Sequence, residues 1–493
     1  MNSADHFDVI IVGAGLSGIG AAVHIKQHCP NKTFALLEGR SKVGGTWDLF
    51  RYPGIRSDSD MHTLGYSFKP WTEAKSIADG PSIRKYVNET AAEHDITQHI
   101  RFNSKVQSAH WSTADAKWEI ETTNEDGDVS KVSANFLFMC GGYYNYDQPH
   151  DPQFEGVDDF KGKVLHPQFW PEDLDYTGKK VIVIGSGATA MTLVPAMADK
   201  AASVTMVQRS PTYVVSRPAQ DNIANTLRKY LPDTWAYALT RLKNTTLQSF
   251  MYKKTRQEPE KVKQQLLKMM GEHLDQDTID KHFTPNYNPW DQRLCLIPNA
   301  DLYTAINSGK ANVVTEHIER FTETGLLLKD GTELEADIIV TATGLEMTVL
   351  SNVEFVVDNE KINFPDKFAY KGMLYSDVPN MVHTFGYINA SWTLRADLTS
   401  EYFCRMLNRM DELGVRQVTP RLRPEDEGMP TRPWIDDFTA GYMARSMHLF
   451  SKQGTGPWRN TQNYALDKKM VRKAPIDDSA LVFDNPKPSS KAA

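Results

Sequence analysis

The chain has 493 residues, of which 40% are apolar and 24% charged, and its formal net charge at pH 7 is −7. This composition is typical of soluble proteins, and the length exceeds one ordinary core, so two or three units are expected. The negative net charge argues against a nucleic-acid-binding protein. No apolar run of about 18 residues occurs, so no membrane-spanning helix is expected.

The N-terminus and the cysteines bear on the cellular compartment. The first residues, MNSADHFDVIIVG, lack a basic segment followed by a long apolar core, so a secretion signal is not expected. Cys29, Cys140, Cys295 and Cys404 lie far apart, which argues against a disulfide framework, a thiolate metal site or a dithiol redox centre. We therefore expect a protein of the reducing cytoplasm that holds no metal.

The chain contains two copies of a strand–turn–helix–strand pattern. In the first copy the apolar run 7–12 precedes the turn GAGLSG, a helix is expected over 16–29 and a second strand over 33–38. The same pattern recurs over 180–209. Two such units predict an α/β protein with two Rossmann-like dinucleotide-binding domains.

The first glycine loop predicts a site for an adenine dinucleotide. Gly13, Gly15 and Gly18 fit the pattern G-x-G-x-x-G, which lets backbone N–H groups approach a pyrophosphate at the positive end of a helix. Glu38 closes the second strand, where a carboxylate accepts hydrogen bonds from both ribose hydroxyls and repels a 2′-phosphate. The alternative is a tight turn in an α/β domain without a ligand.

The second glycine loop, GSGATA, differs in its chemistry. The strand that follows it ends in Gln208-Arg209-Ser210, without an acid. A guanidinium and a hydroxyl at this place suit a 2′-phosphate, so NADP is favoured over NAD; the alternative is that Arg209 is a surface cation. The simplest assignment is therefore FAD at the first loop and NADPH at the second. The loop residues expected to contact the nucleotide are Gly185, Gly187, Ala188, Thr189 and Ala190.

The remaining sequence suggests how the domains are divided. Residues 221–283 are rich in Lys, Gln, Leu and Met at helical spacing, which predicts an inserted helical subdomain. The tail after about residue 450 is rich in Lys, Pro and Ser and is expected to be poorly ordered. Its basic cluster is expected to be a solvated face, although membrane contact stays open. The predicted divisions are 1–150 with 345–465 for FAD, 151–218 with 288–344 for NADP, 219–287 for the helical insert and 466–493 for a C-terminal tail.

Two further segments carry longer motifs. In GGTWDLFRYPGIRSDSD, residues 44–60, the paired glycines let backbone pack closely on a ligand. The density of aromatic and charged residues there favours a ligand site over a solvated loop. In FKGKVLHPQFWP, residues 160–171, each of two prolines disfavours helix in the residue before it, so an extended strap between the two units is expected.

These motifs resemble those of the class B flavoprotein monooxygenases, specifically the type I Baeyer–Villiger monooxygenases. Phe160, Gly162, His166, Trp170 and Pro171 match the signature F-x-G-x-x-x-H-x-x-x-W-P. The segment GTWDLFRYPGIRSD matches a second signature, G-x-W-x-x-x-x-Y-P-G-x-x-x-D. The resemblance extends to about residue 465 and is strongest to the subgroup that contains an ethionamide-activating mycobacterial monooxygenase.

The resemblance implies FAD and NADPH as cofactors. Reduced flavin and O₂ would form a flavin C4a-peroxide that converts a ketone to an ester or lactone, or, when protonated, oxidises sulfides or thioamides. Arg293 matches the family's active-site arginine and Asp58 the carboxylate that positions it, with a surface ion pair as the alternative. His166 is implied to gate or position the strap, and the alternative is a turn cap in a rigid linker.

Other cofactor contacts are implied as well, and two other functions stay open. Gln292 stands where many family members have lysine, which places more of the NADP phosphate contact on Arg209.

The alternatives are a flavin-containing monooxygenase restricted to nitrogen and sulfur oxidation, and a non-oxygenating NADPH flavin reductase or redox-sensing binding protein. The signature with His166 favours the Baeyer–Villiger reaction. The further expected cofactor contacts are Gly45, Thr46, Trp47, Arg56, Ser57, Val106 and Ser210.

Overall fold

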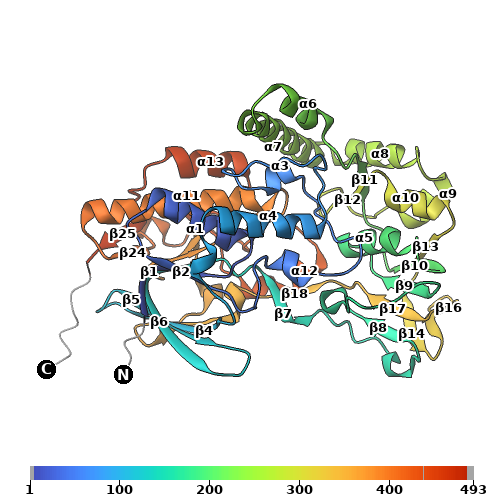
Figure 1. Ribbon diagram of the computed structural model, residues 1–493, viewed down its shortest axis with the longest axis horizontal. Helices are drawn as coiled ribbons and strands as arrows, with labels where there is room; N and C mark the ends of the chain where they lie inside the picture. Colours follow the sequence, from blue (N-terminus) through green and yellow to red (C-terminus); the bar gives the residue numbers. More distant parts are fainter. Residues whose placement is uncertain (1–4, 437, 486–493) are drawn as a thin grey trace.

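The computed structural model describes residues 5–436 and 438–485, which form two units side by side (Figure 1). In the first unit, β1 (Asp5–Val12), α1 (Leu16–His28) and β2 (Phe34–Leu37) form the expected pattern. A nine-stranded sheet has the order β20-β19-β4-β5-β6-β1-β2-β3, and β23 also pairs with β6. The other strands of this sheet are β3 (Ile100–Arg101), β4 (Lys105–Ser112), β5 (Lys117–Thr123), β6 (Val129–Met139), β19 (Glu354–Val357), β20 (Glu360–Lys361) and β23 (Met381–His383).

The first sheet is covered on both faces, which explains the unbroken apolar run of β1. Val9 and Ile11 belong to one buried cluster, whereas Ile10 and Val12 belong to another. Successive side chains of a strand point to opposite faces, so a strand covered on both sides is apolar throughout. The long helix α11 (Trp392–Leu413) packs against α1 on the first of these faces.

The second unit is built on a five-stranded parallel sheet. β9 (Lys180–Ile184), α5 (Ala188–Met197) and β10 (Ser203–Gln208) repeat the pattern of the first unit. The strand order is β13-β10-β9-β17-β8, and every pairing in it is parallel. The fold class predicted from the two glycine loops is therefore confirmed. The other strands are β8 (Lys163–Leu165), β13 (Ala311–Thr315) and β17 (Ile338–Thr341).

Two strands join the units. The chain leaves the first unit through β7 (Tyr144–Pro149) and returns through β18 (Leu345–Met347), and the two pair antiparallel between the sheets (Figure 1). The strap at 160–171 is mostly extended, as predicted, but it does not lie between the units: β8 is an edge strand of the second sheet, and a short 3₁₀ turn follows at Pro167–Phe169.

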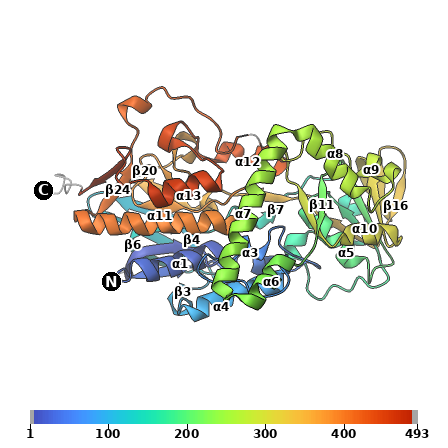
Figure 2. The same cartoon turned by 90° about the horizontal axis from the view of Figure 1, so that it is seen from above.

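The stretch predicted to be helical is confirmed as such. It contains α6 (Asn222–Tyr230), α7 (Asp233–Gln257), α8 (Pro259–Met270) and α9 (Gln276–His282). Seen from above, α7 crosses the molecule over the boundary of the two units (Figure 2). Among the described residues, no helix combines the length and the apolar character needed to cross a membrane.

The remaining helices have four to 14 residues and the remaining strands two to five. The helices are α2 (Thr46–Leu49), α3 (Met61–Leu64), α4 (Gly80–Glu93), α10 (Asp301–Asn307), α12 (Gly441–Ser446) and α13 (Tyr464–Lys473). The strands are β11 (Val214–Arg217), β12 (Cys295–Pro298), β14 (Ile318–Thr322), β15 (Gly325–Leu328), β16 (Glu333–Glu335), β21 (Ala369–Tyr370), β22 (Leu374–Tyr375), β24 (Gln417–Pro420) and β25 (Leu481–Asp484).

The expectation of a poorly ordered chain after about residue 450 is wrong for residues 450–485. Helix α13 packs against α11, and β25 pairs with β24. Val471 is fully buried, and Asp467 forms a buried ion pair with Arg395 at 2.5 Å. These contacts with distant parts of the chain order a segment whose composition alone suggested disorder. Residues 486–493 lie outside the described residues.

Candidate functional site

A cavity of about 1100 Å³ lies where the two units meet, and both glycine loops open into it. This volume slightly exceeds the about 300–1,000 Å³ typical of small-molecule sites. Of the predicted residues that the structure describes, Gly18, Ala190 and His166 do not line this cavity. Those that do are Gly13, Gly15, Glu38, Gly45, Thr46, Trp47, Arg56, Ser57, Asp58, Val106, Gly185, Gly187, Ala188, Thr189, Arg209, Ser210, Gln292 and Arg293.

The first loop leaves bare backbone at the start of α1. A Cβ added at Gly18 would lie 1.8 Å from the carbonyl oxygen of Gly13, so Gly18 permits the turn itself instead of lining the cavity. The N-cap of α1 is Gly15, and no side chain of the described residues caps this helix. The free N–H groups and the helix dipole at this end suit a pyrophosphate.

Glu38 lies at the end of β2 beside this loop. Its carboxylate accepts hydrogen bonds from the N–H of Ala14 at 2.7 Å and from the N–H of Arg40 at 3.0 Å. A carboxylate has about four acceptor sites, so acceptor positions remain for the hydroxyls of a ribose. Burial raises the pKa of Glu38, and the two backbone hydrogen bonds oppose that rise.

The second loop repeats the first. A Cβ at Gly185 would lie 2.3 Å from the carbonyl oxygen of Ala342, and the φ of Gly185 is +134°, so this position requires glycine. Ala190 is fully buried and packs in the core of the second unit, which is why it does not line the cavity. Arg209 and Ser210 are exposed at the cavity wall. Arg209 makes no ion pair with another residue that the structure describes, so its guanidinium is available to an anionic ligand.

The segment 44–60 connects the units physically. Phe50 and Tyr52 belong to the buried cluster of the second unit, together with Leu193 of α5. Arg56, on the same segment, forms an ion pair with Asp301 of α10. A segment that begins beside the first glycine loop therefore ends packed on the helices of the second unit, and it carries Asp58 into the cavity between them.

Arg293 and Asp58 form an ion pair in this cavity. The guanidinium and carboxylate are 2.5 Å apart, and the two side chains are 35% and 30% exposed. Attraction to Asp58 is the main reason that the pKa of Arg293 is raised above its ordinary value, and desolvation opposes it. The arrangement places one permanent positive charge, held by a carboxylate, in the space that both loops share.

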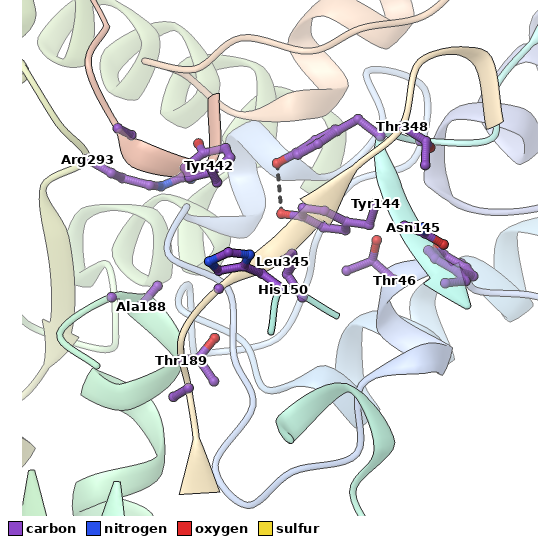
Figure 3. A pocket seen from close by; sticks show the side chains of 18 of the residues that line it. Thr46, Tyr144, Asn145, His150, Ala188, Thr189, Arg293, Leu345, Thr348 and Tyr442 are labelled. Carbon is purple, nitrogen blue, oxygen red and sulfur yellow. Dashed lines mark hydrogen bonds between the residues drawn. The ribbon is translucent and has the colours of Figure 1, made fainter. Parts of the chain in front are cut away.

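Aromatic residues that the sequence analysis missed surround this charge. Tyr442 lies beside Arg293, and the hydroxyls of Tyr143 and Tyr144 are 2.8 Å apart (Figure 3). The ring of Tyr143 stacks on that of Trp392 at a centroid distance of 5.2 Å. Burial raises the pKa of Tyr143, Tyr144 and Tyr442, so all three stay protonated near neutral pH.

The position of two of these tyrosines could have been inferred. Tyr143 and Tyr144 lie just beyond the carboxyl end of β6, after Cys140, Gly141 and Gly142, and ligands of open α/β sheets bind at the carboxyl ends of their strands. The run CGGYYNY after a predicted strand is therefore a usable sequence signal. Tyr442 comes from α12, far along the chain, and nothing in the local sequence indicates its place in the site.

Two histidines lie near the cavity in different ways. His150, at the end of β7, lines it, and burial lowers its pKa. His166 lies behind the cavity wall, with Nε2 3.2 Å from the carbonyl oxygen of Gly344, and its Nδ1 accepts a hydrogen bond from the N–H of Gln168 at 3.2 Å. Burial also lowers the pKa of His166. The neutral ring, with its proton on Nε2, can satisfy both contacts.

The chain matches known proteins along almost its whole length. A family model described as flavin-binding monooxygenase-like matches residues 73–378, and one for an NAD(P)-binding Rossmann-like domain matches residues 11–79. The FAD-containing monooxygenase EthA of Mycobacterium tuberculosis is 51% identical over 482 residues, covering 97% of this chain and 98% of the relative. The probable FAD-binding monooxygenase AlmA of Acinetobacter baylyi is 47% identical, covering 97% of this chain and 96% of the relative.

Solved structures share the fold. An oxidised steroid monooxygenase bound to NADP aligns with a TM-score of 0.78 and 22% identity, over 97% of this chain and all of that chain. A cyclohexanone monooxygenase with bound ε-caprolactone aligns with a TM-score of 0.75 and 20% identity, over 98% of this chain and all of that chain. The family model spans more than half of the chain, and the identity to curated relatives extends over nearly all of it. The chain belongs to the flavin-binding monooxygenase-like family.

Proposed function

We propose that this chain is an FAD-containing, NADPH- and O₂-dependent monooxygenase that converts ketones to esters or lactones and also oxidises sulfides or thioamides. In the main reaction a ketone, O₂, NADPH and a proton give an ester, NADP⁺ and water. One observation carries the proposal: both glycine loops and the Arg293–Asp58 pair open into the same cavity. The FAD-containing relatives and the fold shared with steroid and cyclohexanone monooxygenases support it.

The residues of the two loops fit the two cofactors. Glu38 would accept hydrogen bonds from the FAD ribose, and the free N–H groups at the start of α1 would bind its pyrophosphate. Arg209 and Ser210 would bind the 2′-phosphate of NADPH. Bound together, the cofactors supply electron transfer and O₂ activation. With them we assign 1–150 and 345–465 to the FAD domain, 151–218 and 288–344 to the NADP domain and 219–287 to the helical insert; residues 466–485, expected to form a tail, join the first unit instead, because α13 packs on α11 and β25 pairs with β24.

Arg293 would stabilise negative charge that develops on oxygen during the reaction. A fixed positive charge in a partly desolvated cavity is effective because it needs no rearrangement when the charge appears. Asp58 holds the guanidinium in place and limits the penalty of desolvating it. Tyr143 and Tyr442 are protonated near neutral pH and can donate hydrogen bonds beside it.

His166 would act as a positioning residue. It does not line the cavity, but its contact with Gly344 ties the strap to the loop that follows β17, and Gly344 does line the cavity. Trp170, from the same strap, is buried in the core of the second unit. Movement of the strap would therefore change the wall of the cavity where the two units meet.

The test separates the proposed reaction from its two alternatives. The purified protein is first reduced by NADPH or NADH in the absence of oxygen. It is then mixed with isotopically labelled O₂ and a panel of ketones and sulfides. The masses of the products are measured by mass spectrometry. We expect faster reduction by NADPH and one labelled oxygen atom in an ester. Sulfoxide without any ester would identify a heteroatom monooxygenase, and hydrogen peroxide alone would identify a reductase.

The expected cytoplasmic location belongs to the same proposal. All four cysteines are buried and free. Thiols that stay unpaired are typical of a reducing compartment. Fractionation of the source cell, with the protein detected by antibody, would test this location.

A further inference from the structure

Helix α7 packs against the first unit largely through polar side chains, together with Ala236 and the ring of Tyr237. Arg241 donates a hydrogen bond to the carbonyl oxygen of Gly65 at 2.8 Å and pairs with the carboxylate of Asp397 at 3.2 Å. Asn244 donates a hydrogen bond to Asp60 at 2.9 Å. Amphipathic helices of globular proteins usually bury their apolar side, so α7 has the reverse orientation.

The opposite side of α7 is apolar and exposed. Positions 235, 239, 242 and 250 fall on one side of a helix at 3.6 residues per turn, and 247 flanks them. We call this set the apolar face of α7; its exposed fractions are 66% for Trp235, 44% for Leu239, 59% for Leu242, 48% for Leu247 and 60% for Phe250. The neighbouring helix α6 adds Ile223 and Tyr230, 56% and 80% exposed. A contiguous patch of this kind marks an interaction surface.

The charges around this face are mainly positive. The two helices and their connection, residues 222–257, contain seven lysine and arginine residues but a single acid, Asp233, in a chain whose net charge is −7. Arg241, Lys243 and Arg256 pair with acids of other segments. The other four form no ion pair with residues that the structure describes; they are Arg228, Lys229, Lys253 and Lys254.

We propose that the apolar face of α7 docks on an anionic lipid surface. Tryptophan, phenylalanine and leucine on one side of a helix, with lysine and arginine beside them, is the composition of helices that lie in the interface of a bilayer. Anionic headgroups complement the excess of positive charge. A two-fold contact between two copies of the chain would place the same patch against itself and bring like charges together, so the charge pattern favours lipid over self-association.

The location of the face makes such docking possible for the folded protein. Figure 2 looks down on α7, which crosses the molecule over the boundary of the two units with no other helix above it. The polar contacts of Arg241 and Asn244 keep the helix attached to the first unit while its other side stays exposed. Docking therefore requires no unfolding of α7.

The experiment is sedimentation of the full-length holoprotein with vesicles. One set is phosphatidylcholine alone, and the other is an equal mixture of phosphatidylcholine and phosphatidylglycerol. We expect binding to the mixed vesicles that weakens as salt is raised, because salt screens exposed charges. Leu242→Ser combined with Phe250→Ser should lower the partition by about tenfold or more, since each side chain loses the gain of leaving water.

Matched variants separate the face from general surface effects. Val129 is 61% exposed and lies on β6, far from α7, so Val129→Ser should bind like the parent protein. Lys229→Glu with Lys253→Glu should weaken binding, whereas Lys179→Glu with Lys329→Glu, at exposed positions of the second unit, should not. Bound FAD and the unfolding midpoint of each variant show whether it is folded.

Three results would overturn the proposal. They are no binding of the folded protein to mixed vesicles, binding that the Leu242/Phe250 variant retains in full, and equal binding to both vesicle types at all salt concentrations. Light scattering of the protein without lipid provides a further test. A dimer that dissociates in the Leu242/Phe250 variant would assign the face to self-association instead.

Discussion

The guanidinium of Arg293 lies 2.5 Å from the carboxylate of Asp58, and this ion pair spans the boundary between the two units. Asp58 belongs to the segment that leaves the first sheet, and Arg293 lies in the second unit, between α9 of the helical insert and β12. Because Asp58 raises the pKa of Arg293, the guanidinium is charged throughout the pH range in which proteins are folded. The position of this charge therefore depends on the relative placement of both units.

Arg293→Ala should abolish ester formation while FAD stays bound. Removing a fixed donor from the site of developing negative charge lowers turnover by about 10²–10³-fold. Oxidation of a sulfide should fall less, because attack on a carbonyl depends more on the negative charge that Arg293 favours. The measurement is rapid mixing of the variant with a ketone and a sulfide in parallel.

Arg409→Ala is the control for this variant. Arg409 is 30% exposed and pairs with Asp477 at 2.8 Å, much as Arg293 pairs with Asp58, but it lies on α11 away from the cavity. Its turnover should match that of the parent protein. Near-parental ester formation by Arg293→Ala would show that this arginine is not part of the reaction.

Arg209→Ala should raise the KM for NADPH and leave the KM for NADH nearly unchanged. A hydrogen bond to a charged group contributes about 1.5–3 kcal/mol, which corresponds to about 10- to 150-fold in KM. Steady-state kinetics with both nucleotides tests the prediction. Arg320→Ala serves as the control, because Arg320 is a surface arginine paired with Asp159 outside the cavity. An equal rise in the KM for NADPH and for NADH would show that Arg209 does not bind the 2′-phosphate.

The His166→Ala variant should fold and bind FAD, but a smaller fraction of the NADPH that it oxidises should lead to product. It loses the contact with Gly344, and one hydrogen bond of about 0.5–1.5 kcal/mol corresponds to roughly 2- to 10-fold in turnover. His166→Asn keeps an acceptor near the N–H of Gln168, whereas His166→Gln can reach Gly344. Hydrogen peroxide release per NADPH is the readout. If His166→Gln restores coupling and His166→Asn does not, the contact with Gly344 is the one that supports coupling. If all three variants couple NADPH use to product as well as the parent protein, the strap acts only as a structural spacer.

The sequence predicted the parts of the site that local rules determine. The glycine loops, Glu38 and Arg209 were identifiable because a strand, a tight turn and a helix start follow one another within a few residues. The proximity of Arg293 to Asp58 came from resemblance alone. No local pattern relates a loop after α2 to a segment after α9.

The parts that the sequence missed depend on contacts between distant segments. Tyr442 reaches the site only because α12 packs near β18, which returns from the second unit. The composition of the C-terminal stretch suggested disorder because lysine residues are frequent there and apolar residues are few. Its order depends on partners elsewhere in the chain, such as Arg395 on α11 and the edge strand β24.

Acid should destabilise the protein through His383. Burial lowers its pKa to about 3, and its Nδ1 lies 2.6 Å from the hydroxyl of Tyr375. The folded state keeps this ring neutral, while the unfolded chain binds a proton below about pH 6.5. Stability is therefore complete above that pH and falls as pH decreases toward the folded pKa, by about 2 kcal/mol at pH 5.

Urea unfolding of the parent protein and of His383→Gln at pH 7 and pH 5 measures this effect. Other histidines with lowered pKa values, such as His62 and His282, act in the same direction in both proteins. The difference between the two pH dependences therefore isolates His383. An identical loss of stability in both proteins would show that His383 is not the responsible group.

Asp467→Ala should destabilise the protein by about 3–5 kcal/mol, because it leaves the charge of Arg395 buried without its partner. The pair is 2.5 Å apart with both side chains almost fully buried, and Tyr387 donates a further hydrogen bond to Asp467 at 2.7 Å. Asp477→Ala is the control: it removes the same residue type from the same end of the chain, but its side chain is 56% exposed. Exposed ion pairs contribute about 0–1 kcal/mol, so chemical denaturation should separate the two variants clearly. If both variants unfold like the parent protein, the C-terminal segment contributes no stability and does not belong to the core.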